Sequence, residues 1–311
     1  MPPVEPTPAA FPNPFARYFA ATRPAFLTVA LAAAVLGLAT AHHSGIALDG
    51  VSAFVTVLFA VLAHAGANVL NDYYDALNGT DAANTERIFP FTGGSRFIQN
   101  GVLTLEQTRN FGFALMAAVV IAGLWLLVHS APQLFYLGLA GLFIGWAYSA
   151  PPLNLNGRGL GELCVAAGFG LIVVGVDFVQ RGAFALIPIA VAISYGLLAA
   201  NLLYINQFPD RSADIAAGKL HWVARLPVAQ ARWGYGLIAV AAYGWLSVAV
   251  ALHWLPAAAM LGLFATPLSL KAALHLWHHA HQPQQLAPAI QATIGAMLVH
   301  GALLSAALFF A

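Results

Sequence analysis

The sequence predicts an all-α polytopic membrane protein in which nine helices cross the bilayer. Sixty per cent of its 311 residues are hydrophobic and only 7% are charged, a composition typical of such proteins. A crossing needs roughly 20 mostly apolar residues, and several long segments approach that length. The nine segments are residues 25–41, 51–70, 111–129, 133–149, 161–180, 183–203, 232–252, 255–274 and 290–310.

The remaining residues leave almost no room for a soluble domain. Residues 1–16 are rich in proline, carry a single charge and are predicted to form a disordered lead-in. Residues 17–311 then form one integral-membrane domain. The only cysteine, Cys164, lies in an apolar run, which excludes a disulfide framework.

The basic residues predict the orientation of the chain in the membrane. If the N-terminus is cytoplasmic, 11 of the 12 Lys and Arg residues fall in inner segments and only Arg181 falls outside. This bias predicts a multi-pass protein of the cell's inner (plasma) membrane, with the N-terminus in the cytoplasm. The formal net charge of +1 gives no sign of a nucleic-acid partner, and the lipid bilayer is the expected surrounding.

Acidic residues are concentrated in two short stretches at the ends of predicted crossing segments. Five of the 11 acids lie there, namely Asp72, Asp75, Asp81, Asp210 and Asp214. A carboxylate at the centre of a bilayer costs about 2.5–3.5 kcal/mol, so acids within or beside crossing segments favour a functional site. The orientation above places both stretches on the cytoplasmic face.

Helical spacing is expected to gather the polar residues of the first stretch on one face. Asn68, Asp72 and Asp75 stand at i, i+4 and i+7, which share a helix face. The second stretch repeats this with Asn206, Asp210 and Asp214.

The residues of the second acidic stretch share a helix face only if Pro209 begins a new turn without breaking the helix. Asp72 and Asp210 lie 138 residues apart and each closes an even-numbered segment. That symmetry is compatible with two related four-helix halves and a ninth helix.

Facing carboxylates would repel each other unless cations neutralise them. Oxygen ligands without Cys or clustered His favour Mg²⁺, whose coordination is often completed by substrate phosphates. Two alternatives are weighed against this site. The acids could simply cap helix ends, or they could hold ions in a secondary transporter, which would place them near the midplane in broken helices.

The two stretches carry a resemblance to a known family. Asn71-Asp-Tyr-Tyr-Asp75, with Gly79 and Asp81, resembles the first acidic motif of the UbiA superfamily of intramembrane prenyltransferases. The stretch from Asn206 to Lys219 resembles the second motif. The resemblance implies nine helices around a central cavity, in which Mg²⁺ bridges the two motifs to a polyprenyl diphosphate.

The resemblance and the chemistry of diphosphate release together assign roles to individual residues. Asp72, Asp75, Asp210 and Asp214 are expected to be catalytic and to hold Mg²⁺, largely through the diphosphate. Further substrate contacts are expected from Arg23, Asn68, Asn71, Asp81, Arg96, Tyr148, Asn206 and Lys219.

Within the superfamily, the position of Asp81 and the run Thr92-Gly-Gly-Ser-Arg96 resemble the branch that prenylates 1,4-dihydroxy-2-naphthoate. The resemblance implies transfer of a polyprenyl group to this aromatic acceptor, which gives demethylmenaquinone with loss of carboxylate. Prenylation of another aromatic acceptor, such as 4-hydroxybenzoate, is the alternative within the family. The secondary transporter is the alternative from another class.

The sequence is compatible with more than one role for several residues. The family usually has an Arg after Gly218-Lys219, whereas this chain has Leu220-His221, so one diphosphate-binding cation is either missing or supplied by His221 or Arg225. Asp177 could approach the acceptor or bond a neighbouring helix. The cluster of His275, His278, His279 and His281 has a spacing that zinc could use but lacks Cys partners.

Overall fold

The structure is a computed structural model that describes residues 4–311, and all its regular elements in that range are helices. Eight helical stretches are long and apolar enough to cross a membrane. They are α2 (Pro24–His43), α3 (Gly50–Asn78), α5 (Leu105–His129), α7 (Gly161–Arg181), α8 (Leu186–Ala216), α10 (Val228–Ala251), Ala257–His279 (η3, Ala257–Ala265, followed by α11, Thr266–His279) and α12 (Ala287–Phe310).

A ninth apolar helix, α6 (Leu134–Ser149), is shorter, with 16 residues. Together these stretches account for all nine segments predicted from the hydropathy pattern. The predicted all-α polytopic fold is therefore confirmed within the described residues.

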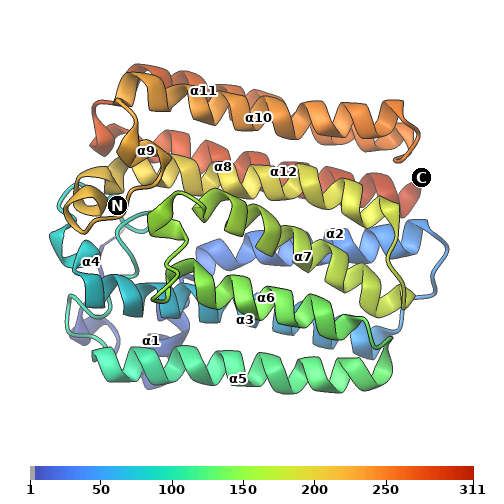
Figure 1. Ribbon diagram of the computed structural model, residues 1–311, viewed down its shortest axis with the longest axis horizontal. Coiled ribbons are helices and arrows are strands. Elements are labelled where there is room, and N and C mark those ends of the chain that lie inside the picture. The colour runs from blue at the N-terminus through green and yellow to red at the C-terminus, as the bar shows by residue number, and fades with distance from the viewer. Residues whose placement is uncertain (1–3) are drawn as a thin grey trace.

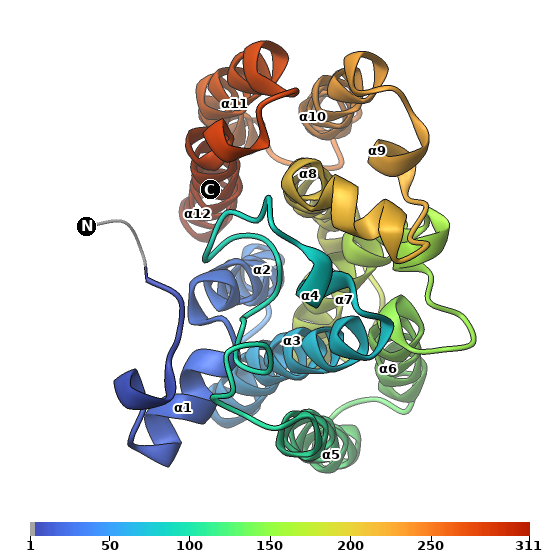
Figure 2. The ribbon, with the colours of Figure 1, turned by 90° about the vertical axis from the view of Figure 1, so that its left-hand side faces the viewer.

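The long helices lie side by side along one direction (Figure 1). The short helices α1 (Pro14–Ala21), α4 (Thr80–Ala83) and α9 (Trp222–Arg225) gather at one end of the bundle, which we call the loop end. The C-terminus lies at the opposite end. Figure 2 looks onto the loop end, where α4 and its flanking loop run across the middle of the bundle. The remaining short turns are η1 (Pro8–Ala10), η2 (Asn156–Arg158) and η4 (Pro283–Gln285).

Local signals set the limits of α3, the helix that carries the first acidic stretch. Asp49 precedes it and accepts a hydrogen bond from the Ser52 amide at 2.7 Å, which satisfies one of the free N–H groups of the first turn. Gly79 ends the helix with φ of 83°, a left-handed conformation that glycine adopts without a Cβ clash. The helix therefore ends at Asn78, three residues beyond Asp75, and the chain turns directly into α4.

The second acidic stretch lies within α8, a helix of 31 residues that contains Pro209. A proline inside a helix removes one backbone hydrogen bond, yet the helix continues to Ala216. The stretch is thus helical throughout, as the shared face of its polar residues requires. Both acidic stretches reach the loop end.

Close contacts between helix backbones hold α7 between α2 and α8. A Cβ at Gly37 of α2 would lie 2.5 Å from the carbonyl oxygen of Val173 on α7, and a Cβ at Gly196 of α8 would lie 2.5 Å from the carbonyl oxygen of Ala166. Only glycine fits at either position. Small residues allow such close approach in membrane bundles, where packing rather than water exclusion holds helices together.

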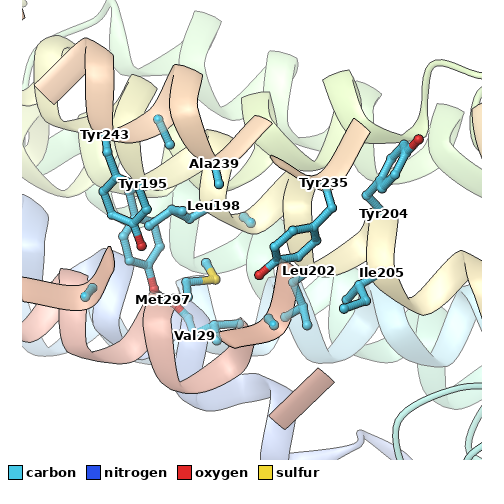
Figure 3. Close-up of a cluster of buried hydrophobic side chains, with 14 of the residues drawn as sticks. Val29, Tyr195, Leu198, Leu202, Tyr204, Ile205, Tyr235, Ala239, Tyr243 and Met297 are labelled. Atoms are coloured by element: carbon cyan, nitrogen blue, oxygen red, sulfur yellow. Dashed lines mark hydrogen bonds between the residues drawn. The ribbon is translucent and has the colours of Figure 1, made fainter. Parts of the chain in front are cut away.

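The largest hydrophobic cluster joins α8, α10 and α12 with part of α2. Figure 3 shows Tyr195, Tyr235, Tyr243 and Met297 converging between these helices. Each of the three tyrosine hydroxyls has a hydrogen-bond partner; that of Tyr195 donates to the Val29 carbonyl oxygen at 2.7 Å. This side of the bundle is tightly filled.

The N-terminal segment differs from the expected disordered lead-in over residues 1–16. Residues 1–3 lie outside the described part of the chain, but residues 4–16 contact the loop that joins α3 to α5. Glu5 pairs with Arg87 at 2.7 Å, and the ring of Phe11 packs against Phe97 with centroids 5.2 Å apart. Composition alone does not reveal these contacts because they form with a loop 80 to 90 residues further along the chain.

Candidate active site in the central cavity

One cavity of about 560 Å³ runs along α3, α5, α6, α7 and α8. Towards the loop end its walls are polar and carry both acidic stretches. Away from that end the lining becomes apolar, with residues such as Phe59, Leu127 and Leu142. Ten of the predicted site residues line it: Arg23, Asn68, Asn71, Asp75, Asp81, Tyr148, Asn206, Asp210, Asp214 and Lys219.

Asp72 lies just outside this lining, although we expected it on the same face as Asn68 and Asp75. Its carboxylate instead accepts the Ser95 amide N–H at 3.2 Å and 3.3 Å. Asn71 takes its place on the cavity face, and its amide donates to Asp75 at 3.1 Å. Asp72 is therefore held by the loop that follows α4, one layer behind the cavity surface.

On α8 the polar face agrees with the helical spacing. Asn206, Asp210 and Asp214 all line the cavity, because the helix continues through Pro209. Asp210 accepts a hydrogen bond of 2.5 Å from the side chain of Asn84. Asn84 is fully buried and was not predicted; its position three residues after Asp81 was the only signal in the sequence.

Lys219 joins the two acidic stretches directly. Its ammonium nitrogen lies 2.6 Å from an oxygen of Asp75 on α3 and 3.5 Å from an oxygen of Asp214 on α8. Burial alone would lower the pKa of Lys219, but these carboxylates outweigh burial and raise it above its ordinary value. Lys219 is therefore a fixed positive charge between two acids.

Asp81 is as enclosed as Asp72, since each has 3% of its surface exposed. Burial and the carboxylates of Asp75 and Asp72 raise the pKa of Asp81 well above its ordinary value. Gly94 leaves room for the carboxylates of Asp81 and Asp72 to lie close together. It has φ of 73°, and a Cβ there would collide with the carboxylate of Asp81 and lie 3.1 Å from Asp72.

The two predicted arginines occupy different places. Arg23 lines the cavity, donates to the Phe91 carbonyl oxygen at 2.9 Å and lies over the Phe26 ring, while its Nε has no partner in the protein. Arg96 lies outside the cavity lining. Its guanidinium donates to the Asp81 carbonyl oxygen and lies 3.9 Å from Glu5, so it braces the loop behind the acids.

The two candidates for the missing cation of the second motif, His221 and Arg225, lie in different surroundings. Its Nε2 lies 3.0 Å from Asp214, and the ring is buried. Arg225 is exposed; its guanidinium donates to the Arg158 carbonyl oxygen and lies over the Trp222 ring. Of the two candidates, only His221 contacts the acidic stretch.

Asp177 and the histidine cluster lie away from the cavity. Asp177 pairs with Arg181 at 2.7 Å and accepts a hydrogen bond from Thr40 at 2.9 Å, so it links α7 to α2 at the end opposite the acids. Between residues 4 and 311, no three His, Cys, Asp or Glu side chains are arranged to hold a metal ion by themselves. The zinc interpretation of His275–His281 therefore finds no support.

The acidic residues supply the oxygen ligands that Mg²⁺ prefers, but they do not by themselves complete its coordination. The donors are carboxylate oxygens from α3, α4 and α8 that line one cavity, where burial and neighbouring carboxylates raise the pKa of Asp81. Because the protein does not bring three such groups together by itself, a bound ion would need further oxygen ligands from water or substrate.

Comparison with known proteins places the chain in a family. The sequence model of the UbiA prenyltransferase family matches residues 26–309. This chain belongs to that family. The predicted resemblance is therefore confirmed over nearly the whole membrane bundle.

Relatives of this UbiA-family chain match most of its length. It is 30% identical over 302 residues to the 1,4-dihydroxy-2-naphthoate octaprenyltransferase of Mycobacterium tuberculosis, covering 95% of this chain and 98% of the relative. It is also 30% identical over 294 residues to the Escherichia coli protein of the same name, covering 89% and 90%. The 2-carboxy-1,4-naphthoquinone phytyltransferase of Synechocystis is 26% identical over 272 residues, covering 86% and 85%.

Solved structures show the same fold. A UbiA homologue from Aeropyrum pernix, in its apo form, superposes with a TM-score of 0.67 at 16% identity, covering 89% of this chain and 96% of the homologue. A UbiA homologue from Archaeoglobus fulgidus bound to GPP and Mg²⁺ gives a TM-score of 0.62 at 16% identity, covering 93% and 99%. The UbiA-family chain is thus a multi-pass membrane enzyme with this helical architecture.

Proposed function

We propose that this UbiA-family protein transfers a polyprenyl group from its diphosphate to 1,4-dihydroxy-2-naphthoate. The observation that carries the proposal is the convergence of the acidic stretches of α3 and α8 on the polar end of one cavity whose other walls are apolar. A diphosphate with a long hydrocarbon chain has the same two-part character. The naphthoate-directed names of several full-length relatives support the acceptor.

Mg²⁺ is the proposed metal, held by Asp75, Asp210 and Asp214, with Asp81 beside them in the cavity lining and Asp72 behind it. When bound, it would stabilise the negative charge that develops on the departing diphosphate. The neighbouring amides of Asn68 and Asn206 would orient these carboxylates or complete the coordination.

Two fixed cations of the chain would act on the diphosphate directly. Arg23 lines the cavity with part of its guanidinium unpartnered, and Lys219 lies between Asp75 and Asp214. Charge-assisted hydrogen bonds from such groups are about twice as strong as neutral ones. Both side chains would hold the leaving group where its charge develops.

Formation of the carbon–carbon bond requires that the protein orient the two substrates and exclude water, and it requires no nucleophilic side chain. The bond between the allylic carbon and the diphosphate oxygen breaks, and the naphthoate ring carbon that bears the carboxylate attacks the allylic carbon. Carbon dioxide then leaves with no net proton change, giving the prenylated naphthalenediol, which is the reduced form of demethylmenaquinone. Apolar walls along α5, α6 and α7 would exclude the water that could otherwise capture the allylic cation.

The cavity position also favours an enzyme over a transporter. The acids lie near the loop end of the bundle rather than half-way along it, and α3 and α8 are continuous helices. We further propose that the loop end is cytoplasmic and that the membrane is the inner (plasma) membrane, because 11 of the 12 basic residues belong to segments on that side.

The test uses the purified full-length protein in vesicles, with Mg²⁺, a polyprenyl diphosphate, and 1,4-dihydroxy-2-naphthoate or 4-hydroxybenzoate in parallel. We expect prenylated naphthalenediol and pyrophosphate from the first acceptor, and loss of both on chelation. Asp210→Asn should lower turnover at least about 100-fold, since it removes charge from the metal site. Undiminished turnover in Asp210→Asn, or no product with either acceptor, would contradict the proposal.

A further inference from the structure

One polar feature of the cavity has no part in the diphosphate site. Gln207 on α8 is 4% exposed, lines the cavity, and neither its amide nitrogen nor its amide oxygen has a hydrogen-bond partner within the protein. Buried amides are nearly always bonded, because leaving them unpaired loses the hydrogen bonds they made to water. An unpaired Gln facing a cavity is therefore expected to bond something that enters it.

The surroundings of Gln207 suggest which substrate it meets. Leu203, one turn away on the same helix, lines the cavity and packs near the start of α7. The same cavity is lined by Tyr148 at the end of α6 and by Asn156 of η2, whose Oδ1 is also unpartnered. Together these residues combine aromatic and apolar surface with hydrogen-bonding amide atoms, which suits a flat aromatic molecule with polar groups.

Helical spacing sets Gln207 beside the acids. Gln207 and Asp210 stand at i and i+3, which are neighbours on a helix face. A molecule bonded to Gln207 therefore lies next to the diphosphate site, as an attacking ring carbon requires.

We propose that Gln207 is a specificity-determining residue that recognises the polar groups of the aromatic acceptor, with the unpartnered Oδ1 of Asn156 as a second polar contact in the same cavity. The inference rests on the proposed function and adds the acceptor's binding site to it. The side-chain amide of Gln207 offers two donors and one acceptor. A ring that carries hydroxyl and carboxylate groups complements both, because its hydroxyl donates and its carboxylate accepts.

The decisive measurement separates binding of the two substrates. In Gln207→Leu, the KM for 1,4-dihydroxy-2-naphthoate should rise about 10-fold or more, because the acceptor loses its hydrogen bonds. The KM for the polyprenyl diphosphate should stay within about twofold, since that substrate binds elsewhere. Asn201→Leu is the matched control: Asn201 is a buried, unpartnered amide on the same helix that does not line the cavity. It should change neither KM.

Two acceptor analogues identify the groups that Gln207 reads. Tested as competitors, 1-hydroxy-2-naphthoate lacks one hydroxyl and 1,4-dihydroxynaphthalene lacks the carboxylate. Gln207→Glu, which has nearly the same size, loses both donors and adds a negative charge. This substitution should weaken the binding of 1-hydroxy-2-naphthoate more than the binding of 1,4-dihydroxynaphthalene, because only the former carries a carboxylate that the new charge repels.

The outcomes distinguish this inference from the function on which it rests. If the wild-type protein prenylates no aromatic acceptor, the proposed function fails and takes the inference with it. If it does, but Gln207→Leu leaves the acceptor KM unchanged, only the inference fails. Equal rises in both KM values, with a lower Tm shared by Asn201→Leu, would show that Gln207 has a packing role and would also overturn the inference.

Discussion

The buried tyrosines on the packed side of this bundle and the amides on its cavity side differ in their hydrogen bonding. Among α8, α10 and α12 the tyrosine hydroxyls find partners: Tyr235 bonds Thr293 and Tyr243 bonds Ser269, both at 2.8 Å. Around the cavity, by contrast, the amides of Asn206 and Gln207 have unpartnered atoms. The bonded tyrosines help to fix a scaffold, whereas in the cavity a substrate would supply the missing partners.

Burial separates α8 from α5, although α10 and α7 are equally buried, each with 33% of the residues in its most apolar part. In the most apolar part of α8, 67% of the residues are buried, against 17% in α5 on the cavity side. A Cβ added at Gly123 of α5, or at Gly138 or Gly141 of α6, would meet no other atom within 4 Å. α8 belongs to both sides: one face is locked into the core, and the other carries the second acidic stretch. Rigid support for one face is what fixes the position of the other.

The largest effect is expected where the two acidic stretches meet. Lys219→Met removes the buried cation from between Asp75 and Asp214, and breaking such a pair typically costs about 3–5 kcal/mol. Thermal unfolding in detergent, with and without Mg²⁺, provides the measurement. We expect Mg²⁺ to stabilise the variant more than the wild type, because the ion replaces the lost charge. Equal Mg²⁺ effects on the two proteins would argue against a metal site here.

Filling the cavity should affect substrate rather than stability. In Gly141→Leu the new side chain enters open space, so the free energy of unfolding should change by less than about 1 kcal/mol. The KM for a long polyprenyl diphosphate should rise about 10-fold, whereas a two-isoprene donor should be affected less. Gly236→Leu, at a glycine of α10 outside the cavity that also has free space, is the control. Equal effects on both donors would place the prenyl chain elsewhere.

On the packed side, a substitution should affect stability rather than substrate binding. Tyr195→Phe removes only the hydroxyl that donates to Val29, so it should lower the free energy of unfolding by about 1 kcal/mol. Both KM values should stay unchanged, because Tyr195 does not line the cavity. Denaturant unfolding and steady-state kinetics on the same preparation provide the measurements. A changed acceptor KM would show that the scaffold and the cavity are less separate than the packing indicates.

The smallest effect concerns the N-terminal segment and depends on pH. The hydrogen bond from Arg87 lowers the pKa of Glu5 below its ordinary value of 4.5. A lowered carboxyl pKa stabilises the folded state above the ordinary value, and that contribution is lost as the pH falls through the lowered pKa. Glu5→Gln should therefore cost about 0.5 kcal/mol at pH 7 and less below pH 4.5.

Hydrogen exchange in residues 95–103, compared between variant and wild type at each pH, reports this local stability. Glu5→Gln should exchange faster at neutral pH, and the two proteins should converge in acid. A difference that persists unchanged at low pH would mean that Glu5 acts through packing rather than charge.

The sequence predicted the parts of this molecule that depend on local pattern. Hydropathy located all nine helices, because a lipid-facing helix must be apolar along its whole length. Spacing along one helix placed Asn206, Asp210 and Asp214 together, since the period of an α-helix is fixed. Lys219 lies only five residues beyond Asp214, so its proximity to that acid could also be expected from the sequence.

The parts that sequence reasoning missed depend on the path of the loop between α3 and α5. Ser95 draws Asp72 away from the cavity, and Arg96 turns behind Asp81, because Gly93 and Gly94 bend the chain back over the acids. No periodicity governs such a path. Gln207 was visible in the sequence, but only its burial without a partner distinguishes it from other polar residues of the motif.

The short helix α6 has a consequence for the surrounding lipid. Its 16 residues span about 24 Å, whereas the hydrocarbon layer of a typical bilayer is about 30 Å thick. On the side where α6 faces lipid, the membrane must thin or polar flanking residues must reach outward, at a fraction of a kcal/mol per Å of mismatch. The bundle should therefore favour thinner membranes and deform thick ones along one flank only, beside the cavity wall that α6 forms.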